Sequence, residues 1–232
     1  MSQEIVIERF FETLINGDRV RARAILDEVF DENTPPQTVL TNLMWPSHEM
    51  IEKAYRADQL TLLGYHFATR LLRALVDQTA GRLHRRESNG RTVLAFCGPS
   101  QSEELGAQIA VDLLESHGFQ VRFAGGGVPG DEILNVVNET RPDFLVLFAS
   151  AASDLPAIRT VINTLREINA ATGTKLAVGG GVFNRAEGLA QEIGVEYFAT
   201  DPLDMVDVLL NNRTTPTQEV APPKRKAKTK AA

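Results

Sequence analysis

Two runs of three glycines are the first features of the sequence that could form part of a binding site, because each follows an apolar stretch typical of a strand. Gly125-Gly126-Gly127 follows residues 119–124, and Gly179-Gly180-Gly181 follows residues 175–178. Glycine at a strand end lets the backbone approach a ligand closely, although it also serves in plain strand-to-helix turns. No Gly-x-Gly-x-x-Gly follows the first predicted strand and no Walker motif occurs, which disfavours a dinucleotide or a nucleoside triphosphate.

Side chains that often act in catalysis are present but scattered. The four histidines lie on separate segments without metal-ligand spacing, and no serine at a predicted strand end is tied to one of them. The first strand end also lacks the paired aspartates of a phosphoryl-acceptor pocket. Cys97 is the single cysteine, which excludes an intramolecular disulfide and indicates a small buried apolar residue. We therefore expect a protein that is not an enzyme.

Charge is unevenly distributed over the 232 residues. The net charge is -6, but five of the 24 basic residues and no acid lie in residues 221–232, which leaves 19 basic and 30 acidic residues, a net of -11. An acidic body disfavours nucleic-acid binding except through this tail. No apolar run reaches the roughly 18 residues of a membrane span, and the acidic start does not resemble a secretory signal. These features predict a cytoplasmic protein without membrane contact.

Helical periodicity dominates residues 1–88. The longest pattern, residues 59–83, repeats apolar side chains at helical spacing from Leu63 to Leu75. Pro46 predicts a kink or a restart after Trp45 within the third helical pattern. We expect a cap bundle of four helices, at residues 2–16, 19–30, 37–57 and 59–83.

Residues 89–211 alternate between strand and helix patterns. Runs that are apolar throughout, such as residues 144–148, fit strands buried on both faces. The alternation predicts an α/β domain with a doubly wound, five-stranded parallel sheet, whose ligands bind beyond the carboxyl ends of the strands. We expect strands at residues 92–97, 119–124, 144–149, 175–178 and 196–199, and helices at residues 103–117, 131–140, 155–170, 186–193 and 202–210. Residues 212–232 are expected to form a disordered basic tail.

Several short motifs match one known family in order and spacing. They include Gly118-Phe119-Gln120-Val121, Gly125-Gly126-Gly127-Val128-Pro129, Arg141-Pro142-Asp143 and Val178-Gly179-Gly180. The arrangement resembles the cobalamin-binding modules of methionine synthase, of corrinoid methyl-carrier proteins and of cobalamin-dependent light-sensing repressors. The resemblance covers about residues 1–210 and implies a flavodoxin-like fold.

The family's metal-ligand motif is altered. Its Asp-x-His-x-x-Gly falls on Gln101, Glu103 and Gly106, and that histidine is the lower cobalt ligand in the family. Glutamate is a hard oxygen donor and replaces imidazole poorly on cobalt. We therefore expect no metal ligand here, although Glu103 holds that position.

The resemblance also places a nucleotide-tail contact beside the glycines. A family serine that contacts the cofactor's nucleotide tail falls on Phe148, which would crowd the tail unless Ser150 or Ser153 takes that place. Gly179 and Gly180 are kept.

The cap of the light-sensing repressors carries Trp, nine residues and then Glu-His over the cofactor. Here Tyr55 and Tyr65-His66 stand at those positions. Both tyrosines are also explained by core packing, and His66 by a helix-face contact. If the site is kept, His66 or Tyr65 should face the loops after the first, third and fourth strands.

The resemblance implies a ligand-binding sensor or regulatory module, with cobalamin held without a histidine ligand. Haem is an alternative flat cofactor. Other readings are a methyl-carrier subunit serving a methyltransferase and a degenerate interaction module without a cofactor. A regulatory protein partner and a homo-oligomer are further expectations.

Overall fold

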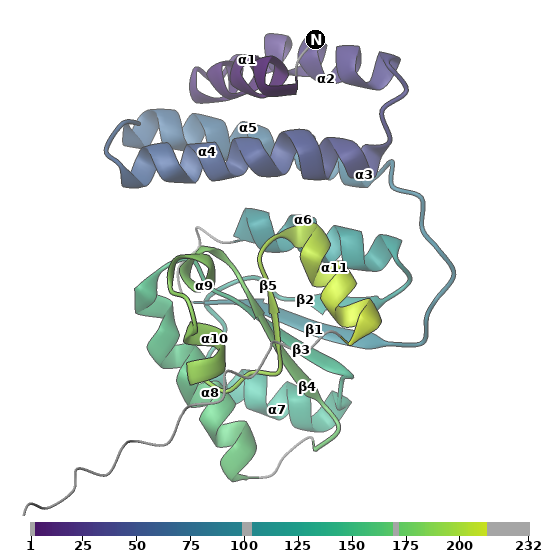
Figure 1. Ribbon diagram of the computed structural model, residues 1–232, viewed down its shortest axis with the longest axis vertical. Coiled ribbons are helices and arrows are strands. Elements are labelled where there is room, and N and C mark those ends of the chain that lie inside the picture. The colour runs from purple at the N-terminus through teal and green to yellow at the C-terminus, as the bar shows by residue number, and fades with distance from the viewer. Residues whose placement is uncertain (1–2, 99–103, 169–171, 213–232) are drawn as a thin grey trace, which may run out of the picture.

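A computed structural model describes residues 3–98, 104–168 and 172–212. Figure 1 shows a helical cap stacked on an α/β domain, with the cap helices lying across one end of the molecule. The expected fold class is confirmed. The predicted tail and the positions of Gln101 and Glu103 lie outside the described residues.

The cap begins with two antiparallel helices that short polar residues delimit. Asp18 caps α2 by accepting a hydrogen bond from the backbone N–H of Arg21, and Thr61 caps α5 through the N–H of Gly64. The cap elements are α1 (Gln3–Ile15), α2 (Arg19–Asp31), α3 (Pro36–Val39), the π-helical turn η1 (Leu40–Met44), α4 (Trp45–Arg56) and α5 (Leu62–Ala80).

The expected helix over residues 37–57 contains an irregularity that the sequence did not locate. The sequence predicted a kink or a restart of the helix at Pro46, and a new helix, α4, does begin there, with Pro46 in its first turn, where its missing N–H costs no helical hydrogen bond. The irregular turn is η1, just before it, where the cap N–H of Trp45 bonds back to the carbonyl of Leu40. A π turn is rare and often marks a functional position.

The sheet is parallel throughout, in the order β2-β1-β3-β4-β5. Helices α6 and α11 cover the face toward the cap, and α7 and α8 cover the opposite face (Figure 1). The strands are β1 (Thr92–Cys97), β2 (Gln120–Phe123), β3 (Phe144–Phe148), β4 (Lys175–Gly179) and β5 (Tyr197–Ala199). The helices are α6 (Glu104–Ser116), α7 (Gly130–Thr140), η3 (Ala152–Asp154, a 3₁₀ turn), α8 (Leu155–Glu167), α9 (Gly181–Arg185), α10 (Leu189–Glu192) and α11 (Pro202–Asn211).

One expected helix, over residues 186–193, is replaced by two shorter ones. Helix α9 begins earlier, within the glycine run, and Gly188 with φ of 79° starts α10 in the left-handed region. That backbone angle interrupts a continuous helix. The consequence is that Asn184 and Arg185 sit on a helix at the carboxyl edge of the sheet.

A hydrogen-bonded linker holds the cap close to the sheet domain. The N–H of Arg86 bonds to the carbonyl of Ser116, and the N–H of Asn89 to that of Gly118, both at 2.9 Å. Helix α5 packs on α6, and buried side chains of the cap and of the cap-facing side of the sheet form one core. The cap is therefore packed against α6 and held in place by contacts with the sheet domain.

No helix among the described residues is both long and apolar enough to cross a membrane. In the same part of the chain, histidine, cysteine and acidic residues form no group of three that could hold a metal ion.

Candidate functional site

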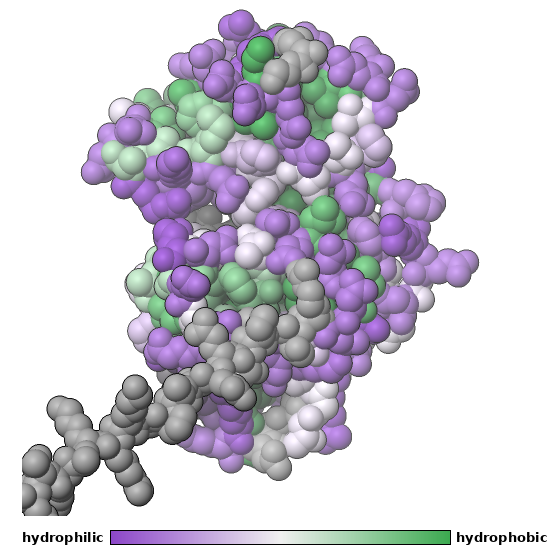
Figure 2. Space-filling view, in the orientation of Figure 1, coloured by the Kyte–Doolittle hydropathy of each residue, from purple (hydrophilic) through white to green (hydrophobic). Residues whose placement is uncertain are grey.

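The cap and the carboxyl edge of the sheet enclose a crevice of about 430 Å³. Figure 2 shows the surface indented between the two parts, with mainly hydrophilic residues around the indentation. Its cap side comes from α4, and its sheet side comes from Ser150 after β3 and from α9. The lining residues are Trp45, Pro46, His48, Glu49, Met50, Glu52, Lys53, Arg56, Ser150, Gly181, Asn184 and Arg185.

Glu52 is the most buried acid of this crevice, with 8% of its surface exposed. The hydroxyl of Tyr65 donates to its Oε1 at 2.7 Å, and Arg56 pairs with its Oε2 at 3.5 Å. Burial raises the pKa of Glu52, while these two partners oppose the rise. Burial also raises the pKa of Glu49, with a smaller contribution from the nearby charge of Asp201.

Two side chains of α9 tie the sheet side of the crevice together. Arg185 donates to the carbonyl oxygen of Ser150, and Nδ2 of Asn184 donates to the carbonyl of Thr200 at 2.7 Å. Since Lys53, Arg56 and Arg185 face the same space as Glu49 and Glu52, both signs of charge are present. Such a wall can hydrogen-bond a neutral, amide-rich ligand.

A second, narrower space lies beneath Trp45, between α6 and the end of β4, and we call it the glycine slot. It is bounded by Gly106, Gly179 and Gly180 and is nearly filled, with about 20 Å³ left. The complete lining is Trp45, Gly106, Ala110, Phe148, Gly179, Gly180, Ala199, Thr200, Asp201, Pro202 and Met205.

His48 lies between the crevice and α6 with 4% of its surface exposed. Its Nδ1 has no hydrogen-bond partner among the described residues. Burial lowers the pKa of His48 to about 4, helped by the charges of Arg56 and Arg73. The imidazole is therefore neutral at physiological pH, with its ring 5.6 Å from that of Trp45.

The structure brings together one part of the sequence-predicted site. Gly106, Phe148, Gly179 and Gly180 line the glycine slot, and Ser150 lines the crevice. Ser153 is exposed on η3 and lines neither space.

The predicted cap residues lie differently. Tyr55 and Tyr65 stack with ring centroids 4.2 Å apart, and Tyr65 reaches the crevice only through Glu52. His66 is exposed and lines neither the crevice nor the slot. The expectation that His66 or Tyr65 lines the crevice is not met, because residues of α4 line its cap side.

Sequence reasoning missed the part played by α4. Neither Trp45 nor His48 was named as a site residue from the sequence, yet both line the crevice. Trp45, His48 and Glu52 are spaced i, i+3 and i+7, which puts them on one helix face. That spacing is the signal that could have found them.

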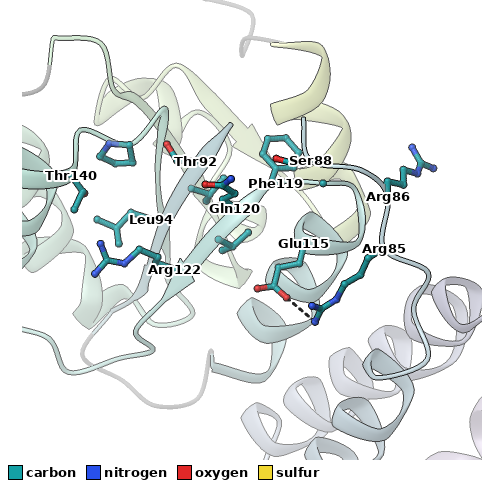
Figure 3. Close-up of a pocket in the computed structure, with 14 residues that line it drawn as sticks. Arg85, Arg86, Ser88, Thr92, Leu94, Glu115, Phe119, Gln120, Arg122 and Thr140 are labelled. Atoms are coloured by element: carbon teal, nitrogen blue, oxygen red, sulfur yellow. Dashed lines mark ion pairs between the residues drawn. The ribbon is translucent and has the colours of Figure 1, made fainter. Parts of the chain in front are cut away.

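Another hollow, of about 490 Å³, lies at the amino ends of the first two strands (Figure 3). It is lined by the linker, β1 and β2, and Arg85 pairs there with Glu115 at 3.5 Å. None of the predicted site residues lines it. Because ligands of parallel sheets bind beyond the carboxyl ends, the crevice is the better candidate.

Two family models, each described as a B12 binding domain, match residues 6–79 and residues 91–205. The chain belongs to the cobalamin-binding domain family. The first match covers most of the cap and the second most of the sheet domain, and the residues that line the crevice and the glycine slot all fall within these ranges.

Relatives of this chain include a transcriptional repressor and corrinoid proteins. The HTH-type transcriptional repressor CarH of Myxococcus xanthus is 26% identical over 182 residues, which are 78% of this chain and 59% of CarH. Dimethylamine corrinoid protein 1 of Methanosarcina acetivorans is 29% identical over 103 residues, 44% of this chain and 47% of that protein. The chain thus spans about half to three-fifths of these relatives.

Among solved structures, the Methanosarcina barkeri monomethylamine corrinoid protein superposes with a TM-score of 0.81. The match covers 91% of this chain and 100% of that chain at 13% identity, so it establishes the shared fold. Cobalamin binding has support in these comparisons, whereas haem and the absence of a cofactor have none.

The described residues fit a corrinoid only in part. The crevice offers an open space with polar walls, but the glycine slot leaves room for about one water molecule. Phe148 lines that slot and lies against Gly179. A nucleotide tail therefore has no space beneath Trp45 in this arrangement.

Proposed function

We propose that the chain is a regulatory module that binds a corrinoid in the crevice between α4 and the carboxyl edge of the sheet. The observation that carries this proposal is the crevice itself, because its two walls come from the two parts of the family's fold. A ligand in the crevice contacts the cap and the sheet domain at the same time. Its binding can therefore change how the two parts are positioned relative to each other.

The regulatory reading is favoured by the extent of the similarity to CarH, which spans the cap and the sheet domain together. The rival reading, a methyl carrier that serves a methyltransferase, is favoured by the corrinoid-protein relatives. Against it stands Glu103 at the position of the cobalt-ligating histidine, since a carrier depends on that ligand to tune its metal. A regulator, by contrast, has only to bind the corrinoid and does not need a ligand that tunes the reactivity of cobalt. Regulation would act on a protein partner or on association of copies of this chain.

We further propose that the corrinoid binds without a protein histidine on cobalt. The test is to incubate the purified full chain with hydroxocobalamin, to remove free cofactor by gel filtration, and to record the visible spectrum. We expect corrin absorption to travel with the protein. Protein that emerges colourless would contradict the proposed function.

The ligand state is tested on the same complex after reduction to the cobalt(II) form. Electron paramagnetic resonance reports the nitrogen bound to cobalt, and we expect identical spectra for chains grown with ordinary histidine and with histidine carrying heavy nitrogen. The Glu103→His variant is the positive control, because its spectrum should change with the label. Sensitivity to the label in the parent chain would show a histidine ligand.

The regulatory part is tested by amide hydrogen exchange with and without the corrinoid. We expect slower exchange in α4 and α9, which wall the crevice, and little change in α2, which does not. Equal exchange in α4 with and without ligand would leave the carrier reading as the better one.

A further inference from the structure

The glycine slot is closed from three sides by large side chains. A Cβ built on Gly106 would lie 3.1 Å from Cζ3 of Trp45, so the indole rests directly on the backbone of α6. A Cβ built on Gly179 would lie 3.0 Å from Cε of Met205 and 3.3 Å from the ring of Phe148. The glycines here make room for this chain's own side chains rather than for a ligand.

The π-helical turn before α4 explains how Trp45 comes to point into the slot. A π turn takes up one residue more than an α turn, so it rotates the following side chains by about 100° relative to an uninterrupted α-helix. Leu40 and Met44, at the ends of η1, are fully buried and fix that turn in the cap core. The rotation is therefore built into the cap.

Phe148 closes the slot from the sheet side. It is the last residue of β3, pairs in register with Gly179 of β4, and exposes 4% of its surface. The ring of Phe148 is buried and that of Trp45 is partly buried, and both rings lie against the glycines of the slot. Packed side chains of this chain thus fill the slot.

We propose that this chain recognises corrinoids by the ring alone, with Trp45 and Phe148 as the residues that set this specificity by excluding a lower nucleotide tail. The inference rests on the proposed function and narrows its ligand class: corrinoids without a nucleotide bind as well as complete cobalamins. The crevice above Trp45 holds the ring, and the nucleotide of a complete cobalamin stays outside the slot.

The experiment compares two ligands on the full chain, dicyanocobinamide, which lacks the nucleotide, and cyanocobalamin. Binding is followed by visible absorbance and by the emission of Trp45, the single tryptophan. We expect dissociation constants within about threefold of each other. Cobalamin bound ten times or more tightly than cobinamide, with Trp45 emission shifted to the red, would show that the tail displaces the indole and would overturn the inference. Failure of both ligands to bind would overturn the proposed function as well.

Variants that open the slot sharpen the comparison. The Trp45→Ala and Phe148→Ala variants should gain a preference for cobalamin over cobinamide of about tenfold, since the tail can then be buried. The matched control is Phe198→Ala, which removes an aromatic ring from the opposite face of the sheet and should leave the ratio of the two affinities near one. An unchanged ratio in both slot variants would refute the assignment to Trp45 and Phe148.

Discussion

The indole of Trp45 rests on Gly106, with Cζ3 only 3.1 Å from the place where a Cβ would stand. The Gly106→Val substitution should therefore push the indole out of the glycine slot and lower the free energy of unfolding by about 1–3 kcal/mol. Chemical denaturation measures the loss. The emission of the single tryptophan should shift to the red in the folded variant.

Gly81→Val is the control for this substitution. Gly81 ends α5, and a Cβ there would meet only backbone oxygens at 3.6 and 3.7 Å, which is ordinary contact. Its tryptophan emission should match that of the parent chain. A Gly106→Val protein with unchanged emission would show that Trp45 is not held against α6.

Acid should destabilise the chain through His48. Burial lowers its folded-state pKa to about 4, below the ordinary value of 6.5, so the unfolded chain binds the proton more readily between these values. Stability is therefore present at neutral pH and falls as the pH drops from about 6.5 toward 4, by at most about 3 kcal/mol. Urea denaturation of the parent chain and of His48→Gln across this range measures the difference.

We expect His48→Gln to be less stable at neutral pH and to lose the parent's extra acid sensitivity. The same substitution at exposed His66 is the control and should retain the parent's behaviour. Equal acid sensitivity in the parent and in His48→Gln would contradict the assignment.

Asp112 should have the opposite pH dependence. Burial raises its pKa to about 6 from 3.8, its Oδ1 accepts from Gln108 at 2.8 Å, and its Oδ2 has no partner among the described residues. The folded state therefore holds the proton more tightly, so stability is lost as the pH rises through about 6.

Asp112→Asn removes that cost while keeping an acceptor for Gln108. At pH near 7.5 it should stabilise the chain by about 1 kcal/mol, a value discounted for partial exposure to solvent, and the gain should vanish near pH 4. Thermal denaturation at both pH values measures it, with Asp27→Asn on the exposed side of α2 as the control. If Asp112→Asn still stabilised the chain at low pH, the gain would not come from removing the charge of Asp112.

Tyr65 should support the crevice through Glu52. The Tyr65→Phe substitution removes the 2.7 Å hydrogen bond to a largely buried carboxylate, so we expect a loss of about 1–2 kcal/mol in the free energy of unfolding. Tyr55→Phe keeps the stacked ring pair and is the matched control, with an expected change under about 0.5 kcal/mol. Equal changes in the two variants would contradict the assignment of the loss to the hydrogen bond between Tyr65 and Glu52.

The arrangement of helices and strands was predictable because it depends on local patterns. Alternation of apolar runs with helical periodicity gave the five parallel strands, and the predicted strand 92–97 coincides with β1. Gly179 and Gly180 were recognisable for the same reason, since they lie at a strand end, whereas Gly106 was named through the family motif. Phe148 was named because the resemblance places there the family serine that contacts the nucleotide tail.

The cap side of the site was not predictable in this way. The spacing of the resemblance pointed to Tyr55, Tyr65 and His66 rather than to the residues at the start of α4. The π turn at residues 40–44 rotates Trp45 and His48 toward the sheet, so α4 forms the cap side of the crevice. A π turn leaves little trace in periodicity, because the extra residue is absorbed within one buried segment.

The sequence by itself determined the family, the order of cap and sheet, and the loss of histidine at the cobalt-ligand position, since these are properties of residue types and their spacing. Only the tertiary structure decided that α4 walls the crevice and that Trp45, Phe148 and Met205 close the glycine slot. These contacts join residues from the cap, β3 and α11 that are far apart in the chain. Long-range packing of this kind depends on how whole elements meet, which no local pattern encodes.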